Sequence, residues 1–282
     1  MSALRGVAAT ALGVARVRAA ESTRPDRLFQ DPYAAAFLAA AADPDAPEEP
    51  AEPLEPGSEA DRWARAMAHH IVIRTRFFDD RLTEATWQRG LRQVVVPAAG
   101  LDVRAHRLDW PEGTRLFEID VPAVLAFKEA VLAEQGAVAR CERRTVAADL
   151  REDWPGALRE AGFDPRQPTA WLVEGLLVYL SAEEAAALLG ALGEQSAPGS
   201  FLTFPGARDF RSSPLLRGTR RAGPKGLADL WRGGLAEDAG PWLARRGWRP
   251  QVHDRSEIAA AYGRPSPSGR RGSGFVTAVR EG

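Results

Sequence analysis

Short apolar runs alternate with amphipathic stretches from Gln93 to the end of the chain. The runs are rich in β-branched and aromatic residues, which is typical of strands buried on both faces of a parallel sheet. They predict strands over 93–96, 115–119, 143–147, 170–173, 201–204, 248–253 and 274–280. Helical spacing between the runs predicts helices over 121–134, 154–161, 181–195 and 241–246. The alternation as a whole predicts an α/β fold with a doubly wound sheet.

The first third of the chain has a different pattern. Alanine, leucine and valine recur near helical spacing over residues 2–42, where Pro25 and Pro32 punctuate the pattern. A second helical pattern covers residues 59–88. Residues 43–56 between them are acidic and rich in proline, with no basic residue, which predicts an exposed loop.

Composition narrows the class of protein. Of the 282 residues, 45% are hydrophobic and 27% are charged, which is ordinary for a globular chain. The 37 basic and 38 acidic residues give a net charge of −1, so the basic surplus of a nucleic-acid-binding protein is missing. No apolar run approaches the roughly 20 residues that span a bilayer, and the N-terminus lacks the apolar core of a signal peptide. We therefore expect a cytoplasmic protein that binds neither membranes nor nucleic acids.

The number and spacing of the cysteine and histidine residues exclude further classes of site. Cys141 is the single cysteine, so neither an internal disulfide framework nor a thiolate zinc cluster is expected. The histidines are His69, His70, His106 and His253, and no cysteine or carboxylate ligand pattern accompanies them. No metal site is predicted. His69 and His70 could supply a base to a hydroxyl acceptor, but a structural role is the simpler interpretation.

The most informative segment runs from Val94 to Asp120. A predicted buried strand leads into the small residues Ala98, Ala99 and Gly100, and a second strand ends at Asp120, 20 residues after Gly100. At this spacing an acidic side chain can accept hydrogen bonds from the ribose hydroxyls of a nucleoside at the carboxyl ends of parallel strands. Small residues at such a turn are equally compatible with close strand–helix packing.

The segment favours one kind of nucleoside ligand. It lacks the G-x-G-x-x-G pattern of dinucleotide-binding proteins, and Asp102 lies where a diphosphate would have to approach a helix N-terminus. A nucleoside without phosphates fits better, and S-adenosylmethionine is the common ligand of that kind.

Several segments together resemble a known family. They are PAAGLDVRAHRLDWPEGTRLFEID at 97–120, RTRFFDD at 74–80, AADLREDWP at 147–155, PTAWLVEGLLVYLSAEE at 168–184, RAAESTRPDRLFQDPYA at 18–34 and RGWRPQVHDRSEIAAAYGR at 246–264. With these segments in the family's order along the chain, the protein is similar to the leucine carboxyl methyltransferase-like family of class I S-adenosylmethionine-dependent methyltransferases. The resemblance covers nearly the whole chain and implies a Rossmann-like methyltransferase sheet with S-adenosylmethionine as cofactor.

The resemblance also implies roles for individual residues. Arg74 would hold the methionine carboxylate of the cofactor, with Arg76 as its competitor, and Glu174 would lie beside the methionyl portion. Asp120 would accept from the ribose. Asp149 and Leu150 would contact the adenine, although Asp149 could instead cap the following turn.

One residue departs from the family pattern. Ala98 occupies the position of a family glycine at the cofactor turn, with Gly100 two residues later. A methyl group at this position puts cofactor affinity in question. The alternatives to a methyltransferase are therefore a non-catalytic S-adenosylmethionine-binding protein and an enzyme that uses the sulfonium for another reaction.

The expected function is transfer of a methyl group from S-adenosylmethionine to an oxygen of a small-molecule carboxylate or hydroxyl. The resemblance implies an N-terminal helical lid or cap over 1–90 and a catalytic core over 91–282, with an insertion for the acceptor near 205–240. Tyr179 is a candidate acceptor contact or a packing residue. Arginines between Arg208 and Arg221 could bind an anionic acceptor, and no catalytic residue is assigned.

Overall fold

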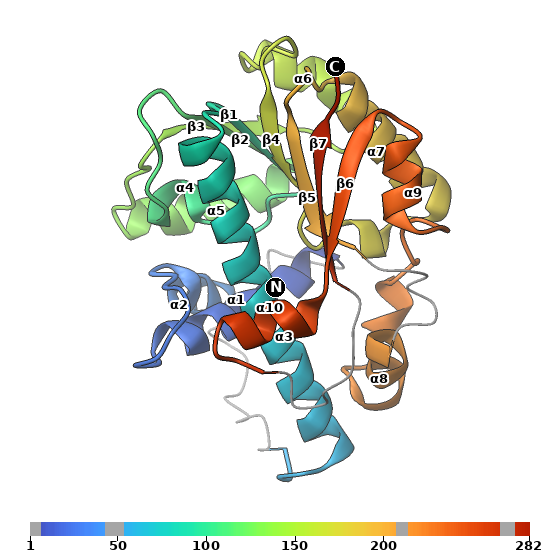
Figure 1. Ribbon diagram of the computed structural model, residues 1–282. Helices are drawn as coiled ribbons and strands as arrows, with labels where there is room; N and C mark the ends of the chain where they lie inside the picture. The colour runs from blue at the N-terminus through green and yellow to red at the C-terminus, as the bar shows by residue number, and fades with distance from the viewer. Residues whose placement is uncertain (1–6, 43–53, 207–213, 266–273) are drawn as a thin grey trace.

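A seven-stranded sheet forms the centre of the computed structural model, which describes residues 7–42, 54–206, 214–265 and 274–282 (Figure 1). Its order is β3-β2-β1-β4-β5-β7-β6. The first five strands are parallel to one another, whereas β7 is antiparallel to both of its neighbours. The strands are β1 (Gln93–Pro97), β2 (Arg115–Asp120), β3 (Glu142–Ala147), β4 (Thr169–Leu172), β5 (Phe201–Pro205), β6 (Trp248–His253) and β7 (Phe275–Arg280).

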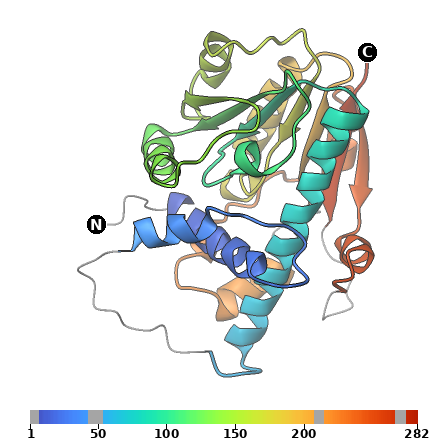
Figure 2. The same ribbon diagram turned by 90° about the vertical axis from the view of Figure 1, so that its left-hand side faces the viewer.

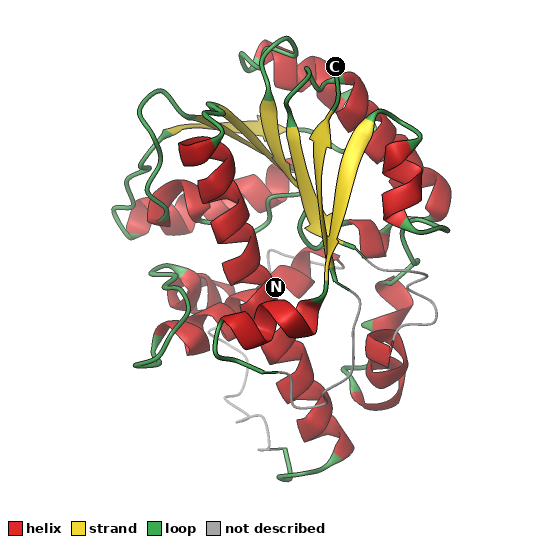
Figure 3. Ribbon diagram, in the orientation of Figure 1, coloured by secondary structure: helices red, strands yellow, loops and turns green. Residues whose placement is uncertain are grey.

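Helices cover both faces of this sheet (Figure 3). One face is packed by α6 (Trp154–Glu160), α7 (Ala182–Glu194) and α9 (Ala239–Ala244). The other is packed by α3 (Glu59–Thr83), α4 (Arg104–Arg107), α5 (Pro122–Glu134) and α10 (Arg255–Ala261). The central strands are therefore buried on both sides, which explains their continuous apolar sequences.

The remaining helices lie beyond the carboxyl ends of the parallel strands (Figures 1 and 2). They are α1 (Val7–Ser22), α2 (Ala34–Ala41), α8 (Pro214–Ala222) and the single 3-10 turns η2 (Leu177–Tyr179) and η4 (Ala228–Leu230). Helix α1 packs on α2 and α3, and α8 packs on α3. Helix α3 continues into a π-helical turn, η1 (Glu84–Gln88). None of the described helices is both long and apolar enough to cross a membrane.

Each predicted strand and core helix is present within a few residues of its expected bounds. The helical prediction over 2–42 is only partly right over residues 7–42, and its residues 2–6 lie outside the described part of the chain. Residues 23–33, which contain Pro25 and Pro32, form turns between α1 and α2, because proline cannot donate the hydrogen bonds that would continue a helix. Within the expected connection after Pro205, the structure forms α8 and η4.

The strand order places a switch point between β1 and β4. β2 and β3 continue the sheet on one side of β1, and β4 and β5 continue it on the other. Connections on the two sides run in opposite directions, which leaves a crevice at the carboxyl ends of β1 and β4, where open α/β sheets bind ligands.

A buried ion pair fixes α5 against the sheet. Lys128 Nζ on α5 lies 2.7 Å from Glu118 Oε2 on β2, and both side chains are fully buried. Arg143 on β3 donates to the same oxygen at 2.6 Å. The two cations together compensate the cost of burying the carboxylate.

We predict that Lys128→Met destabilises the protein by about 3 kcal/mol, because it leaves Glu118 buried with only one of its two cationic partners. Urea unfolding measures this change. Lys225 is exposed and is the only other lysine, so Lys225→Met is the control and should change stability by less than about 0.5 kcal/mol. Equal stability of the two variants would contradict the role of the ion pair.

Candidate functional site

The turn after β1 is joined to the end of β2 by one carboxylate. Asp120 Oδ2 accepts from the backbone N–H of Gly100 at 2.6 Å, and Oδ1 accepts from the N–H of Val121 at 2.8 Å. Burial raises the pKa of Asp120 above its ordinary value, and these two backbone hydrogen bonds offset only part of that rise. The spacing of 20 residues thus brings Asp120 to the glycine turn, at the edge where a nucleoside would bind.

Ala98 adopts a glycine-like backbone. Its φ is +51°, and it is the one non-glycine residue with a positive φ in the part of the chain that the structure describes. Gly100, two residues later, has a φ of +50°. The alanine therefore keeps a left-handed turn in spite of the steric cost that this conformation carries for a Cβ atom.

Helix α1 closes over this turn. A Cβ built on Gly100 would lie 3.7 Å from the Cβ of Ala11. Arg18 on the same helix donates from Nη2 to the carbonyl oxygen of Leu101 at 2.6 Å, and its Nε lies 2.8 Å from Asp31 Oδ2. The contacts of Ala11 with Gly100 and of Arg18 with Leu101 thus place α1 directly against the loop that would face a cofactor.

A buried network of charges lies behind the crevice. Arg104 at the start of α4 contacts Asp79 Oδ1 from Nε at 2.7 Å, Glu174 Oε2 from Nη2 at 2.9 Å, and the carboxylate of Asp102. Glu174 follows β4, and its Oε1 accepts from Arg74 Nε at 2.7 Å. Arg74 on α3 is thereby fixed, with neither of its Nη atoms bonded to a described residue.

Opposite charges in the network favour the ionised forms of Glu174, Asp102 and Arg104. Burial alone would raise the pKa of Glu174, but Arg104 and Arg74 outweigh it and lower the pKa. Burial opposes the charge of Asp102 in the same way, yet Arg104 and Lys128 hold its pKa at about 2. The three carboxylates around Arg104 more than offset the burial of its guanidinium, so its pKa lies well above the ordinary value. Asp102 is paired with Arg104 inside the protein, so its charge would not repel a diphosphate as the sequence suggested. The argument against a dinucleotide ligand therefore rests only on the missing G-x-G-x-x-G pattern.

Asp149 and Leu150 lie just after β3, on the same edge of the sheet. Asp149 accepts from the backbone N–H of Arg151 at 3.0 Å and from Arg151 Nε at 2.9 Å, and the side-chain contact holds the pKa of Asp149 at about 2. The capping alternative is thus observed in this structure. Leu150 is half-buried and packs against the core cluster of that face.

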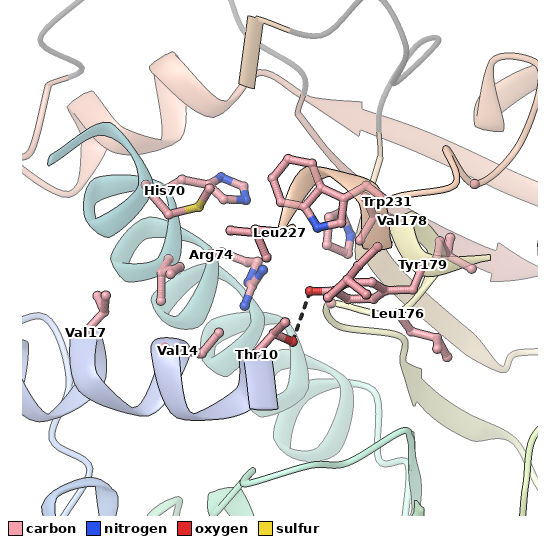
Figure 4. A pocket seen from close by; sticks show the side chains of 18 of the residues that line it. Thr10, Val14, Val17, His70, Arg74, Leu176, Val178, Tyr179, Leu227 and Trp231 are labelled. Atoms are coloured by element: carbon pink, nitrogen blue, oxygen red, sulfur yellow. Dashed lines mark hydrogen bonds between the residues drawn. The ribbon is translucent and has the colours of Figure 1, made fainter. Parts of the chain in front are cut away.

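A cavity of about 830 Å³ adjoins the Arg74 side of the crevice (Figure 4). Its walls come from α1, α3, the segment after β4, the end of β5, and the segment around η4. Arg74 and Tyr179 line it, whereas Ala98, Gly100, Asp120, Asp149, Leu150 and Glu174 are not among its lining residues. The predicted site residues therefore divide between the strand ends and this cavity.

Tyr179 closes one side of the cavity. Its hydroxyl lies 3.1 Å from Thr10 Oγ1 on α1, so the residue links the segment after β4 to the N-terminal helix (Figure 4). Three of the arginines from Arg208 to Arg221 lie in the described part of the chain, and none of these three lines the cavity. Arg208 and Arg211 lie outside the described residues, and Arg221 pairs with Glu59 on α3 at 2.9 Å.

His70 lies one helical turn before Arg74 and lines the same cavity. Its Nδ1 is 3.1 Å from Arg255 Nη1, a group that can only donate, so Nδ1 accepts. Burial, followed by the charge of Arg74, lowers the pKa of His70 well below its ordinary value. His70 is therefore a neutral imidazole whose proton lies on Nε2.

The other candidate groups have structural environments. His69 Nε2 contacts the carbonyl oxygen of Arg264 at 2.8 Å, and His253 Nε2 contacts Thr277 Oγ1 at 2.8 Å. Burial raises the pKa of Cys141 to about 12, so the thiol is unreactive at neutral pH. Among the residues described, no group of three or more histidine, cysteine or carboxylate side chains could hold a metal ion.

Sequence reasoning missed the centre of the charge network. Arg104 and Asp79 both lie inside segments that carried the resemblance, but neither was singled out. A usable signal was present, because Asp102 and Arg104 directly follow a buried strand and its turn, where unpaired charges are rarely tolerated.

Solved structures define the fold class. A DUF574 family protein from Streptomyces avermitilis superposes with a TM-score of 0.58 at 15% identity, covering 95% of this chain and 97% of that one. A protein from Thermobifida fusca, described as a putative methyltransferase, gives a TM-score of 0.51 at 19% identity, covering 95% and 94%. The sheet order and these neighbours define a Rossmann-like α/β fold.

Sequence comparison then gives the family. Residues 11–193 match the model of the leucine carboxyl methyltransferase family. Relatives from Frankia alni and Streptomyces coelicolor are 51% and 50% identical over 98% of this chain, which is 95% and 96% of their own lengths. Both are named "Putative S-adenosyl-L-methionine-dependent methyltransferase". The chain belongs to the leucine carboxyl methyltransferase family.

We predict that Ala98→Gly raises the free energy of unfolding by roughly 0.5–1 kcal/mol. The change removes the left-handed strain of alanine, which exceeds the entropy that glycine adds to the unfolded chain. Ala99→Gly is the matched control and should destabilise, since Ala99 is buried without a positive φ. Urea unfolding of both variants tests this, and a destabilised Ala98→Gly variant would contradict it.

The charge network predicts a pH dependence of stability. The pKa of Asp102 falls from 3.8 to about 2 on folding, so its stabilisation is complete above pH 4 and is lost as the pH falls towards 2. Between pH 5 and pH 3, the wild type should lose about 1 kcal/mol more stability than Asp102→Asn. Parallel urea denaturation at both pH values measures the difference, and equal losses would show that Asp102 is not charged in this way.

Proposed function

We propose that this protein transfers a methyl group from S-adenosylmethionine to an oxygen of a small-molecule carboxylate or hydroxyl. One observation carries the proposal. At the switch point of a methyltransferase-type sheet, an acidic strand end meets the glycine turn, and a largely buried, pre-oriented arginine lines a cavity large enough for a small molecule.

The residues at the strand ends fit S-adenosylmethionine. Asp120 would accept from the ribose hydroxyls, and such hydrogen bonds favour its ionised form against the burial that raises its pKa. The turn of Ala98 and Gly100 has the left-handed backbone that lets a ligand approach closely. Leu150 would pack on the adenine. Asp149 would accept from its amino group after exchanging one of its contacts with Arg151.

Arg74 would hold the methionine carboxylate. Its Nε is engaged by Glu174, which leaves both Nη atoms to donate to an incoming carboxylate. A Cβ built on Gly175 would lie 3.9 Å from Nη2, so a glycine at this position leaves the guanidinium accessible. Glu174 therefore serves the methionyl portion indirectly by orienting Arg74, and its remaining charge favours an ammonium or sulfonium nearby.

S-adenosylmethionine, when bound, supplies a methyl group on a positively charged sulfur. The protein's part in such a transfer is mainly to orient acceptor and donor in line and to exclude water. Helix α1 would exclude water from the site, because it lies on the Gly100 turn and is joined to Tyr179. We accordingly propose that, within the N-terminal part up to residue 90, α1 and α2 form the lid.

Helix α3 belongs to the same N-terminal part but has another role in this proposal. Phe77 and Phe78 are buried in the sheet core, so the C-terminal half of the helix stays with the core. A moving lid would then open between α1 and the loop it covers, through the contacts of Ala11, Arg18 and Thr10.

We predict that S-adenosylhomocysteine raises the melting temperature, because a ligand that binds only the folded state stabilises it. Asp120→Asn should weaken its binding by about 1.5–3 kcal/mol, the range for hydrogen bonds to a charged group. Asp109→Asn is the control, since that side chain is 87% exposed. Thermal shift and titration calorimetry measure both effects. A flat melting curve at millimolar ligand would overturn the cofactor, and unchanged affinity in Asp120→Asn would overturn the ribose contact.

A further inference from the structure

His70 presents a single hydrogen-bond donor to the cavity that it lines. Its ring stacks on that of Phe275 on β7, with centroids 6.5 Å apart and planes 15° from parallel, and its Nδ1 lies 3.1 Å from Arg255 Nη1. These two contacts fix the plane and the tautomer of the imidazole, so the proton is on Nε2. Among the residues that the structure describes, Nε2 has no partner of its own. The side chain therefore offers the cavity an N–H that a ligand can use.

Arg255, the first residue of α10, holds His70 in this state. It is half-buried, and within the described part of the chain it makes no ion pair. The neighbouring Asp254 instead caps α10 by accepting from the backbone N–H of Ser256 at 2.7 Å. A partly desolvated guanidinium without an ion pair contributes little to stability. Its bond to the imidazole is therefore better explained by a role in the site than by a role in folding.

The polar side chains that line the cavity offer mainly donors. No aspartate, glutamate, asparagine or glutamine is among the lining residues that the structure describes. Arg16, Arg74 and Lys225 can only donate. The hydroxyls of Thr10 and Tyr179 could accept, but they are 3.1 Å apart and bonded to each other. Such side chains suit a ligand whose polar atoms only accept, as carbonyl oxygens do.

The charge of that ligand follows from the cations that remain. Arg74 is paired with Glu174 and is assigned above to the methionine carboxylate of the cofactor. The other basic lining residues, Arg16 and Lys225, are exposed. A carboxylate next to His70 would therefore be buried without an ion pair, which costs far more than burial of a hydrogen-bonded carbonyl group.

Resting on the function proposed above, we infer that the methyl acceptor is an uncharged, apolar ring system with a carbonyl oxygen that accepts from His70 Nε2. Arg255 is the positioning residue of this contact, because it selects the tautomer that donates into the cavity. His70 orients the acceptor and takes no proton from it, since Nδ1 is engaged by Arg255 and Nε2 by its own hydrogen.

The walls of the cavity suit a ring system. Trp63, Met67, Leu227 and Trp231 contribute large side chains, and Figure 4 shows Leu227 and Trp231 turned towards the same space as His70. A cavity of about 830 Å³ with such walls suits a molecule of drug-like size. Aromatic walls favour flat, aromatic ligands, which can stack on them or meet them edge to face.

The position of His70 brings the acceptor to the cofactor. His70 lies four residues before Arg74 on α3, so both side chains are on one face of the helix. A carbonyl held by His70 is therefore close to the place assigned to the methionyl portion. The ring system then extends from this point between the large side chains of the walls.

Matched ring systems test the carbonyl contact. Tryptophan fluorescence would follow titration with 9-fluorenone, which has a carbonyl group, and with fluorene, which has a methylene group in its place. His70→Phe keeps a ring against Phe275 and should lower the ratio of the fluorenone affinity to the fluorene affinity about fivefold, the effect of one hydrogen bond between uncharged groups. His69→Phe is the control and should keep the wild-type ratio, since His69 contacts Arg264 and does not line the cavity.

Two further probes sharpen the comparison. His70→Gln retains an N–H donor and should keep most of the wild-type ratio, and His70→Leu replaces His70→Phe if circular dichroism shows that the latter is unfolded. Fluorene-9-carboxylate should bind more weakly than fluorenone. An unchanged ratio without the donor, no saturable binding of fluorenone by wild type, or tighter binding of the carboxylate would each overturn the inference.

The role of Arg255 has a spectroscopic readout. Proton–nitrogen correlation spectra distinguish the protonated from the unprotonated ring nitrogen of each histidine. In wild type, Nε2 of His70 should be the protonated nitrogen, and Arg255→Met should shift both nitrogens towards a mixture of tautomers. Arg255→Lys keeps a donor and should restore the wild-type spectrum. A spectrum of Arg255→Met identical to that of wild type would show that Arg255 does not set the tautomer.

Titration with S-adenosylhomocysteine separates the failure of the two proposals. If wild type does not bind this ligand, the proposed function fails, whereas the fluorenone and fluorene affinities can still be measured on the free protein. If the ligand binds but the ratio is equal in wild type and His70→Phe, only the carbonyl contact fails.

Discussion

The site depends on one buried cation. Arg104 contacts Asp79 on α3, Asp102 in the turn after β1, and Glu174 after β4. A guanidinium is planar, permanently charged and rich in donors, so one side chain can bind three carboxylates in fixed directions. Its side chain is only 3% exposed, and loss of any partner would leave a charge in a poorly solvated place. The helix, the turn and the strand end are thereby held in one arrangement.

Glu174 connects Arg104 to the crevice, because it contacts both Arg104 and Arg74. One oxygen of this carboxylate is held by Arg104 and the other by Arg74, so the orientation of Arg74 is set by residues from other elements. A surface arginine loses side-chain entropy whenever it grips a ligand. Because Arg74 has already lost that freedom on folding, the binding of a carboxylate costs less, which is the usual benefit of pre-organisation.

The sequence predicted the sheet and the strand-end residues because their signals are local. The apolar run at Gln93 and the acidic end of the next strand can be interpreted without knowing any partner. The pairing of Arg104 with Asp79 spans 25 residues, and the contact of Tyr179 with Thr10 spans 169, so no periodicity indicates either. The cavity was harder still to predict from the sequence, since walls of it come from α1, η2 and η4, which lie outside the regular alternation of strands and helices.

Helix α3 connects these parts, as Figure 2 shows by its length along the molecule. Its C-terminal half packs into the sheet core through Phe77 and Phe78, and its N-terminal half borders the cavity and contacts α8 through Trp63. Arg74 lies between the two halves. Residues towards the N-terminus of α3 can therefore change the shape of the cavity while the core keeps Arg74 in place, so under the proposed function acceptor choice would vary independently of cofactor binding.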